Sequence, residues 1–184
     1  IVVIMKPSLP LKLFDLCVIP KHADVKSVGN VFITNTSLVN FNLNMKKKEN
    51  MALFLIGGPS KHFYWDSKIV LEQIKNISKK FKFKKLLITT SRRTPIDFIN
   101  EFNKLKIKNI KLYEYTKTKN DWLDKNIIRA KNIWVTNDSY SMLIEAIASG
   151  ASTDILELKI KKKLKLSMEI NSIKKKIRNK IIIQ

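Results

Sequence analysis

The stretch that decides the fold reads Ile133-Trp-Val-Thr-Asn-Asp-Ser-Tyr-Ser-Met-Leu-Ile-Glu-Ala146 and continues to Gly150. Its first part is apolar and predicts a buried β-strand, and its second part repeats apolar residues at helical spacing. Asp138 or Ser139 can cap the helix, and Gly150 suits the left-handed residue that ends it. A strand that passes through polar residues into a helix is the geometry of a phosphate or nucleotide pocket, because helix amino termini attract anions.

Glu145 stands on this helix in one stripe with Asp138 and Ser141, apart from the apolar stripe. A carboxylate one turn beyond the helix start can accept hydrogen bonds from both hydroxyls of a ribose whose phosphates lie at that start. The alternative is a capped surface helix with a solvated glutamate, and this window alone favours that alternative.

Strand and helix patterns alternate outward from this stretch. Apolar strands are expected at residues 51–56, 85–90, 109–113, 132–136 and 153–158, and helices begin near Asp66, Thr94 and Asp121. Regular alternation predicts an α/β fold with a Rossmann-type parallel sheet and helices on both faces.

Three segments follow from these patterns. Residues 1–45 contain short apolar strands at 1–5, 14–19 and 31–34 and a polar linker, and we interpret them as the remnant of a truncated N-terminal α/β domain. Residues 46–158 form the Rossmann-type domain. Residues 159–184 are rich in Lys and Ile and predict a closing helix or a partly disordered tail.

The composition restricts the partners. The net charge is +21, but 32 of the 36 basic residues are Lys, scattered over predicted helix faces and not interleaved with aromatic residues. This pattern argues against specific nucleic-acid binding and leaves peripheral association with an anionic membrane open. No apolar run approaches the roughly 20 residues of a membrane span, so we expect a cytoplasmic protein, with the inner face of the membrane as a second location.

Few residues suit metal or redox chemistry. Cys17 is the only cysteine and lies in an apolar run, which predicts a buried small hydrophobic residue. The two His residues are far apart, so no metal site is expected.

Three loops should meet at the carboxyl edge of the predicted sheet, where such folds bind ligands. In the first, Gly57-Gly58-Pro59-Ser60-Lys61, small residues let backbone N–H groups approach an oxyanion; a tight turn is the equal alternative. The second, Ser91-Arg92-Arg93-Thr94, places two guanidinium groups at a helix start, which favours an anion partner. The third is Thr136–Ser141.

No catalytic residue can be identified with this reasoning. His62 is the one side chain near these loops that could act as an acid or base, and a structural role in its aromatic-rich loop is the alternative.

Three motifs carry a family resemblance: Gly57-Gly-Pro-Ser-Lys-His62, Ser91-Arg-Arg-Thr-Pro95 and Val135-Thr-Asn-Asp-Ser-Tyr-Ser-Met-Leu-Ile-Glu-Ala146. Together they resemble the ELM-type mitochondrial fission protein family. The segments Phe14–Asp24 and Asn30–Thr34 also look like that family's, in the same order, so the resemblance covers about residues 1–158. After Gly150 the family usually has a basic residue and Pro, whereas this chain has Ala151-Ser-Thr-Asp154, which leaves the start of the last strand open.

Members of this family look like GT-B glycosyltransferases, whose C-terminal domain holds a nucleotide-sugar donor and whose N-terminal domain holds the acceptor. The resemblance implies Glu145 on the ribose, Ser139 and Ser141 near the diphosphate, the Gly57-Gly58 loop at the cleft, and Arg92 and Arg93 as anion partners. It also implies metal-independent transfer with no cofactor, because helix dipoles and basic groups stabilise the departing diphosphate.

Loops and resemblance together give one set of expected nucleotide- or phosphate-binding residues: Gly57, Gly58, Ser60, Lys61, Arg92, Arg93, Thr136, Asp138, Ser139, Ser141 and Glu145. The donor would be a nucleotide-diphosphate sugar of unknown identity, and the acceptor is unknown. We expect residues 1–184 alone to be inactive, since an acceptor site would lie upstream. The alternative is a non-enzymatic interaction protein of the fission type that retains the GT-B fold.

Overall fold

The computed structural model describes residues 1–36, 38, 48–105, 109–119 and 121–161. The chain forms two compact units, Ile1–Leu43 and Asn44–Gln184, and each is described by itself. The predicted boundary at residue 45 falls among residues that the structure does not describe.

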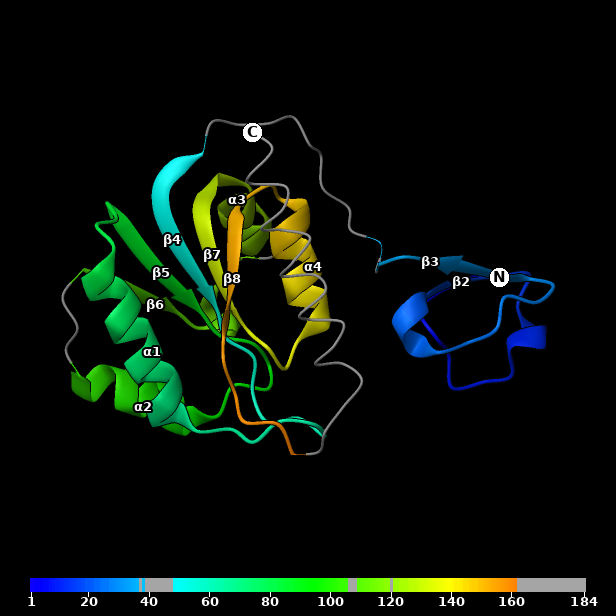
Figure 1. The fold of residues 1–184 in the computed structure, drawn as a ribbon, viewed down its shortest axis with the longest axis horizontal. Coiled ribbons are helices and arrows are strands. Elements are labelled where there is room, and N and C mark those ends of the chain that lie inside the picture. The colour runs from blue at the N-terminus through cyan, green and yellow to red at the C-terminus, as the bar shows by residue number, and fades with distance from the viewer. Residues whose placement is uncertain (37, 39–47, 106–108, 120, 162–184) are drawn as a thin grey trace. The chain divides into compact units, whose positions relative to one another are not determined.

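The larger unit contains a five-stranded parallel sheet in the order β6-β5-β4-β7-β8 (Figure 1). Its strands are β4 (Glu49–Leu55), β5 (Lys85–Thr89), β6 (Ile110–Tyr113), β7 (Ala130–Thr136) and β8 (Ser152–Leu156). The chain first builds β4, β5 and β6 outward and then returns to add β7 on the other side of β4. The predicted Rossmann-type fold is therefore confirmed, and β8 starts one residue before the predicted Thr153.

Within the described residues, four α-helices flank this sheet: α1 (Ser67–Lys80), α2 (Ile96–Leu105), α3 (Trp122–Arg129) and α4 (Tyr140–Ala148) (Figure 1). Alternate strand residues face the two sides of the sheet. Ala52, Phe54 and Ile56 pack into one core with the buried faces of α1 and α2. Helix α3 packs against β4 and β7, and α4 packs against β7 and β8.

For α1, the predicted start is correct, but one residue of the predicted buried face is not buried. The Asp66 carboxylate caps α1, accepting hydrogen bonds from the backbone N–H groups of Lys68 and Ile69 at 2.9 and 3.2 Å. Helical spacing predicts a buried stripe of Ile69, Val70, Ile74 and Ile77 on this helix, but Ile69 is 50% exposed and Leu71 is buried in its place. Gly150 has a φ of +73°, which confirms the left-handed residue after α4.

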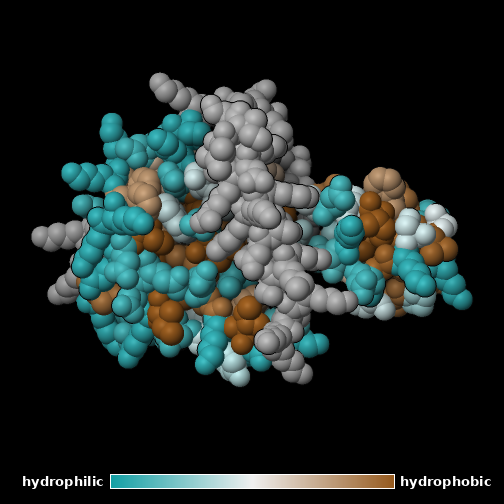
Figure 2. Space-filling view, viewed as in Figure 1, coloured by the Kyte–Doolittle hydropathy of each residue, from teal (hydrophilic) through white to brown (hydrophobic). Residues whose placement is uncertain are grey.

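The smaller unit contains a three-stranded parallel sheet, β1 (Val2–Ile4), β2 (Leu16–Pro20) and β3 (Val31–Thr34), with 3₁₀ helices at Leu11–Leu13 and Lys21–Ala23. One face holds a small core that includes Cys17, which is fully buried as predicted. The other face exposes apolar side chains that lie in register, among them Val2, Ile4 and Phe32. Figure 2 shows apolar side chains grouped on this unit, whereas hydrophilic ones cover most of the visible larger unit.

The chain after β8 runs along the loop that follows β4. Phe63 and Ile160 form an antiparallel bridge, and Lys161 Nζ donates a hydrogen bond to the Ser60 carbonyl at 3.1 Å. The predicted closing helix or tail lies outside the described residues from 162 onward. In the part of the chain that is described, no helix has the length and apolar character needed to cross a membrane.

Candidate functional site

The candidate site lies where the sheet changes direction. Strands β4 and β7 are neighbours, but the chain leaves β4 toward β5 and leaves β7 toward β8. The loops after these strands lie at the carboxyl edge of the sheet, which is where open α/β sheets bind ligands. The structure brings the three predicted loops together at this edge.

Two threonine hydroxyls join the loops at Gly57, and Gly58 contacts the third loop; we call this meeting point the Gly57–Gly58 junction. The Thr136 hydroxyl oxygen accepts a hydrogen bond from the Gly57 N–H at 2.8 Å. The Thr94 hydroxyl donates to the Gly57 carbonyl at 2.6 Å. Thr136 is fully buried, and it therefore joins β7 to the loop after β4 rather than presenting its hydroxyl at the surface. Thr94 was expected to cap α2, but its hydroxyl contacts this junction and the Ser91 N–H instead.

Asp138 provides the anion at the junction. Its Oδ2 accepts a hydrogen bond from the Gly58 N–H at 3.1 Å and forms an ion pair with Arg93 at 2.8 Å. The Asp138 side chain is 0% exposed and the Arg93 side chain 43%. The guanidinium and the backbone N–H that were expected to hold a ligand phosphate thus hold a carboxylate of the chain itself.

Both glycines are required by close contact. A Cβ at Gly57 would lie 2.3 Å from either carboxylate oxygen of Asp138, and one at Gly58 would lie 2.0 Å from the Arg93 carbonyl oxygen. Neither glycine has a positive φ. The predicted role of these residues, close approach of backbone to an oxyanion, is therefore met by Asp138.

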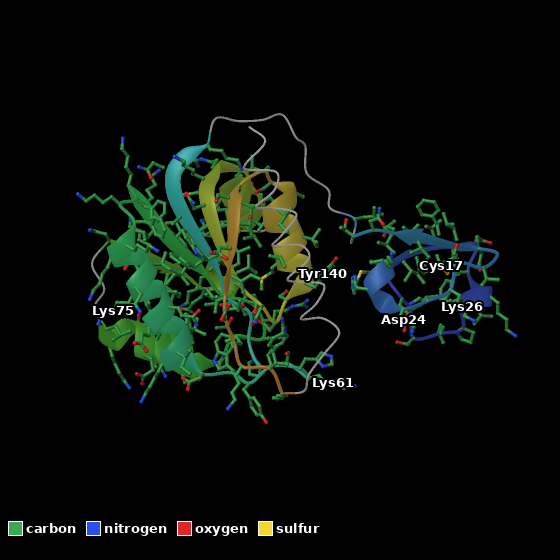
Figure 3. The ribbon with its side chains drawn as sticks, viewed as in Figure 1. Cys17, Asp24, Lys26, Lys61, Lys75 and Tyr140 are labelled. Carbon is green, nitrogen blue, oxygen red and sulfur yellow. The ribbon has the colours of Figure 1, made fainter. Side chains whose placement is uncertain are left out.

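Among the described residues, the amino terminus of α4 has no side-chain cap. Ser139 is its N-cap residue but forms no side-chain capping bond, and Asp138 is turned toward Gly58 and Arg93. The predicted side-chain cap is thus wrong for both residues. Since the first N–H groups of a helix have no acceptor within the helix, this end keeps hydrogen-bond donors and a positive dipole. Figure 3 shows Tyr140 at this end of α4 and Lys61 in the loop after β4.

Glu145 lies further along α4 and is half-buried. Burial raises its pKa above the ordinary value for glutamate, and the negative charge of Asp124 on α3 raises it further. No described residue donates a hydrogen bond to its carboxylate. A half-buried carboxylate of this kind is a good acceptor for ligand hydroxyls, because it has lost water without gaining protein donors.

The other predicted residues lie at the surface of the same loops. Ser60 Oγ accepts hydrogen bonds from the His62 and Phe63 N–H groups at 3.3 and 3.2 Å, so it orders its own loop. Arg92, Lys61, His62 and Ser141 are exposed. Within the described residues, Arg92 has no acidic partner, unlike Arg93.

Among the described residues, no group of three or more His, Cys, Asp and Glu side chains lies close enough together to hold a metal ion.

Sequence reasoning missed the pairing of Arg93 with Asp138. The two residues are separated by two strands and two helices, so no local pattern links them. The one signal in the sequence was Asp138 itself. It follows an apolar strand, and a carboxylate that becomes buried there needs a positively charged partner.

Comparison with known proteins agrees with this architecture. The sequence profile of the family described as mitochondrial fission ELM1 matches residues 1–179. No curated protein and no solved structure matches the chain. Because the profile spans nearly the whole sequence, the chain belongs to the mitochondrial fission ELM1 family.

Proposed function

We propose that this protein binds a nucleotide-diphosphate sugar at the carboxyl edge of the larger sheet, and that the intact protein transfers the sugar to an acceptor. The observation that supports binding most directly is the amino terminus of α4, which follows β7 at the carboxyl edge of the sheet and has no side-chain cap. Helix α1, by contrast, is capped by Asp66, whose carboxylate already accepts from its first N–H groups.

In this proposal the diphosphate lies at the start of α4, near Ser139 and Ser141. Arg92 binds the diphosphate, because Arg93 already forms an ion pair with Asp138. Glu145 accepts hydrogen bonds from the ribose hydroxyls, which replace the water that burial removed from its carboxylate.

Transfer would follow direct displacement of the diphosphate. The α4 dipole and the Arg92 guanidinium would stabilise the negative charge that develops on the leaving group. This step rests on the GT-B resemblance, and His62 remains the candidate acid or base in the adjoining loop.

A thermal-shift screen with uridine, guanosine, cytidine, adenosine and thymidine diphosphates tests binding. A ligand at about one hundred times its dissociation constant adds about 2.7 kcal/mol of stability, so one member should clearly raise the unfolding midpoint. Arg92→Ala and Glu145→Gln should each weaken that ligand about tenfold, since each removes a charged hydrogen-bond partner. Lys75→Ala, on the exposed face of α1, is the matched control.

Arg92 should be changed without Arg93. Removing Arg93 would leave the buried Asp138 carboxylate without its ion pair, and the resulting loss of stability would obscure a loss of binding. If no diphosphate changes the midpoint, or if both variants bind as well as the unmodified protein, the donor-site proposal fails.

A second candidate function is supported by Asp138. If its carboxylate always occupies the Gly57–Gly58 junction, a phosphate cannot bind there. The protein would then act by binding a protein partner instead. The same screen separates the two candidates, because this one requires that no nucleoside diphosphate stabilises the protein even at saturating concentration.

A further inference from the structure

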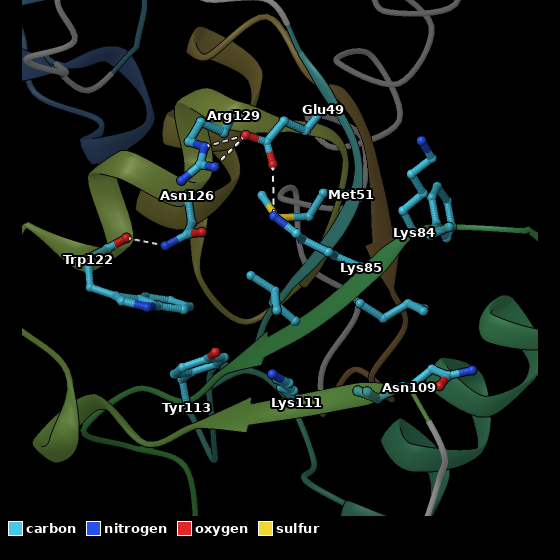
Figure 4. Close-up of a pocket in the computed structure, with 14 residues that line it drawn as sticks. Glu49, Met51, Lys84, Lys85, Asn109, Lys111, Tyr113, Trp122, Asn126 and Arg129 are labelled. Carbon is cyan, nitrogen blue, oxygen red and sulfur yellow. Dashed lines mark hydrogen bonds and ion pairs between the residues drawn. The ribbon is translucent and has the colours of Figure 1, made fainter.

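A second concave site lies on the larger unit, formed by β4, β5, β6 and α3 (Figure 4). It is a cavity of about 800 Å³. None of the residues of the three loops at the carboxyl edge lines it. The cavity is therefore distinct from the candidate nucleotide site.

Helix α3 has eight residues and packs against β4 and β7. The cavity lies beside this helix, against β5 and β6. Met51 and Leu87 form an apolar floor. Lys111 and Tyr113, two residues apart on β6, project from the same side of the sheet.

The walls carry more positive than negative charge. Four basic residues, Lys84, Lys85, Lys111 and Arg129, line the cavity together with one carboxylate, Glu49. Glu49 Oε1 accepts a hydrogen bond from Arg129 Nε at 2.6 Å, and its Oε2 lies 3.4 Å from Lys85 Nζ. One carboxylate thus positions two of the cations without balancing all four, and no described residue forms an ion pair with Lys111.

An aromatic pair forms one wall. The ring centroids of Tyr113 and Trp122 are 4.5 Å apart, with the planes inclined at 34°. The Asn126 side-chain amide donates a hydrogen bond to the Trp122 carbonyl at 2.7 Å and lines the cavity itself. Flat aromatic surface beside cations suits a molecule that has both a ring and an anionic group.

We propose that this cavity binds a small phosphorylated molecule, with its phosphate among Lys85, Lys111 and Arg129 and its ring against Tyr113 and Trp122. The volume lies within the range of about 300–1,000 Å³ that small-molecule sites occupy. A phosphate fits better than a single carboxylate, because its two charges and three terminal oxygens can engage several cations at once. The ring could belong to a sugar or to a nucleobase, and the experiment distinguishes these sources.

Two-dimensional ¹⁵N–¹H NMR of the full 184-residue chain tests this proposal. The probes are inorganic phosphate, glucose 1-phosphate and adenosine monophosphate. We expect saturable shifts of the Trp122 indole N–H and the Asn126 side-chain amide with at least one ring-bearing probe, and weaker shifts with phosphate alone. The sugar and nucleoside probes show which ring the aromatic wall accepts.

Variants identify the contacts. Lys111→Gln should weaken the effective probe about tenfold, because it removes a charged contact. Trp122→Leu should weaken ring-bearing probes and leave inorganic phosphate unchanged. Lys75→Gln is the matched control, and Arg92→Ala should have no effect on this site.

Three outcomes would overturn the proposal. They are shifts confined to the Gly57 and Gly58 N–H groups, no saturable shift at millimolar probe, and equal affinity of the Lys111→Gln and Lys75→Gln variants. The first of these would support the candidate nucleotide site while eliminating this one, so the two proposals can fail separately.

Discussion

Glu145 is a residue whose negative charge opposes the stability of the fold. Burial is the main cause that raises its pKa, and the charge of Asp124 adds to it. A carboxyl group whose folded pKa lies above its unfolded value contributes stability below the unfolded pKa, and that contribution is lost as the pH rises through the folded pKa. At neutral pH the ionised side chain is therefore a cost to the fold.

Glu145→Gln should consequently make the protein more stable at pH 7, with a smaller difference near pH 4, about the pKa of an unfolded glutamate. Urea denaturation at both pH values measures the effect. Glu72→Gln, at an exposed position on α1, should change neither value much. An unchanged or lower midpoint for Glu145→Gln at pH 7 would show that the carboxylate is better solvated or paired than described.

Asp138 is the opposite case, a charged residue that the fold needs. Asp138→Ala removes the acceptor for the Gly58 N–H and the partner of Arg93. We expect the free energy of unfolding to fall by about 1–3 kcal/mol, which is the cost of leaving such a group unpaired. Urea denaturation checks this, with Asp154→Ala at an exposed position of β8 as the control. If both variants lose the same free energy of unfolding, the contacts of Asp138 at the junction do not stabilise the fold.

At the scale of elements, Lys48 connects two helix ends. Its Nζ donates hydrogen bonds to the Ile128 carbonyl at 2.8 Å and to the Ser149 carbonyl at 2.6 Å, at the carboxyl ends of α3 and α4. Burial lowers the pKa of Lys48, while the negative ends of both helix dipoles stabilise its charge. The boundary predicted at residue 45 puts Lys48 just after the linker, and the structure makes it part of the larger unit.

Lys48→Ala should therefore lower the free energy of unfolding by about 1–2 kcal/mol, since the last carbonyls of both helices lose a charged donor. Chemical denaturation followed by circular dichroism measures the change. Lys75→Ala on α1 provides the comparison, because the Lys75 side chain is exposed and forms no ion pair among the described residues. A Lys48 variant as stable as that control would mean that water replaces the lysine at these carbonyls.

At the scale of the whole molecule, the net charge of +21 acts on both units. The basic residues outnumber the acidic ones 36 to 15, so most lysines repel one another rather than forming ion pairs. At 0.1 M ionic strength, salt largely screens this repulsion between charges that are more than about 10 Å apart.

Potassium chloride should accordingly raise the unfolding midpoint by about 2–4 °C, equivalent to about 1 kcal/mol for a chain of this size. Differential scanning calorimetry between low and physiological ionic strength measures the shift, with chloride chosen because sulfate and phosphate resemble the proposed ligands. A midpoint that falls with salt would show that attractive ion pairs, not repulsion, dominate the stability.

The order of strands and helices could be predicted from the sequence, because each element carries its own pattern. The apolar run at Ile133–Val135, the Asp66 cap and the Gly150 terminus are local signals that survive in the folded chain. Helix rotation was less predictable: Ile69 and Leu71 are both apolar, and only packing against the sheet chose which is buried.

The position of the candidate site could be predicted from the sequence, but the ion pair within it could not. Parallel strands of an α/β sheet bring their following loops to one edge, so the meeting of the three loops follows from topology. Which side chains neutralise one another there depends on distances that no local pattern contains. Arg92 and Arg93 look equivalent in sequence, but only Arg93 has an acidic partner in the described structure.

The sequence by itself determined the alternation of elements, the parallel sheet and the edge where its polar loops gather, because hydrophobic period, capping residues and glycines act over a few residues. Tertiary structure alone decided that Asp138 occupies the Gly57–Gly58 junction and that Trp122 and Tyr113 stand beside Lys111. The reason is physical: charge pairing and aromatic contact depend on separation in space, and these residues become neighbours only when the sheet and α3 have packed.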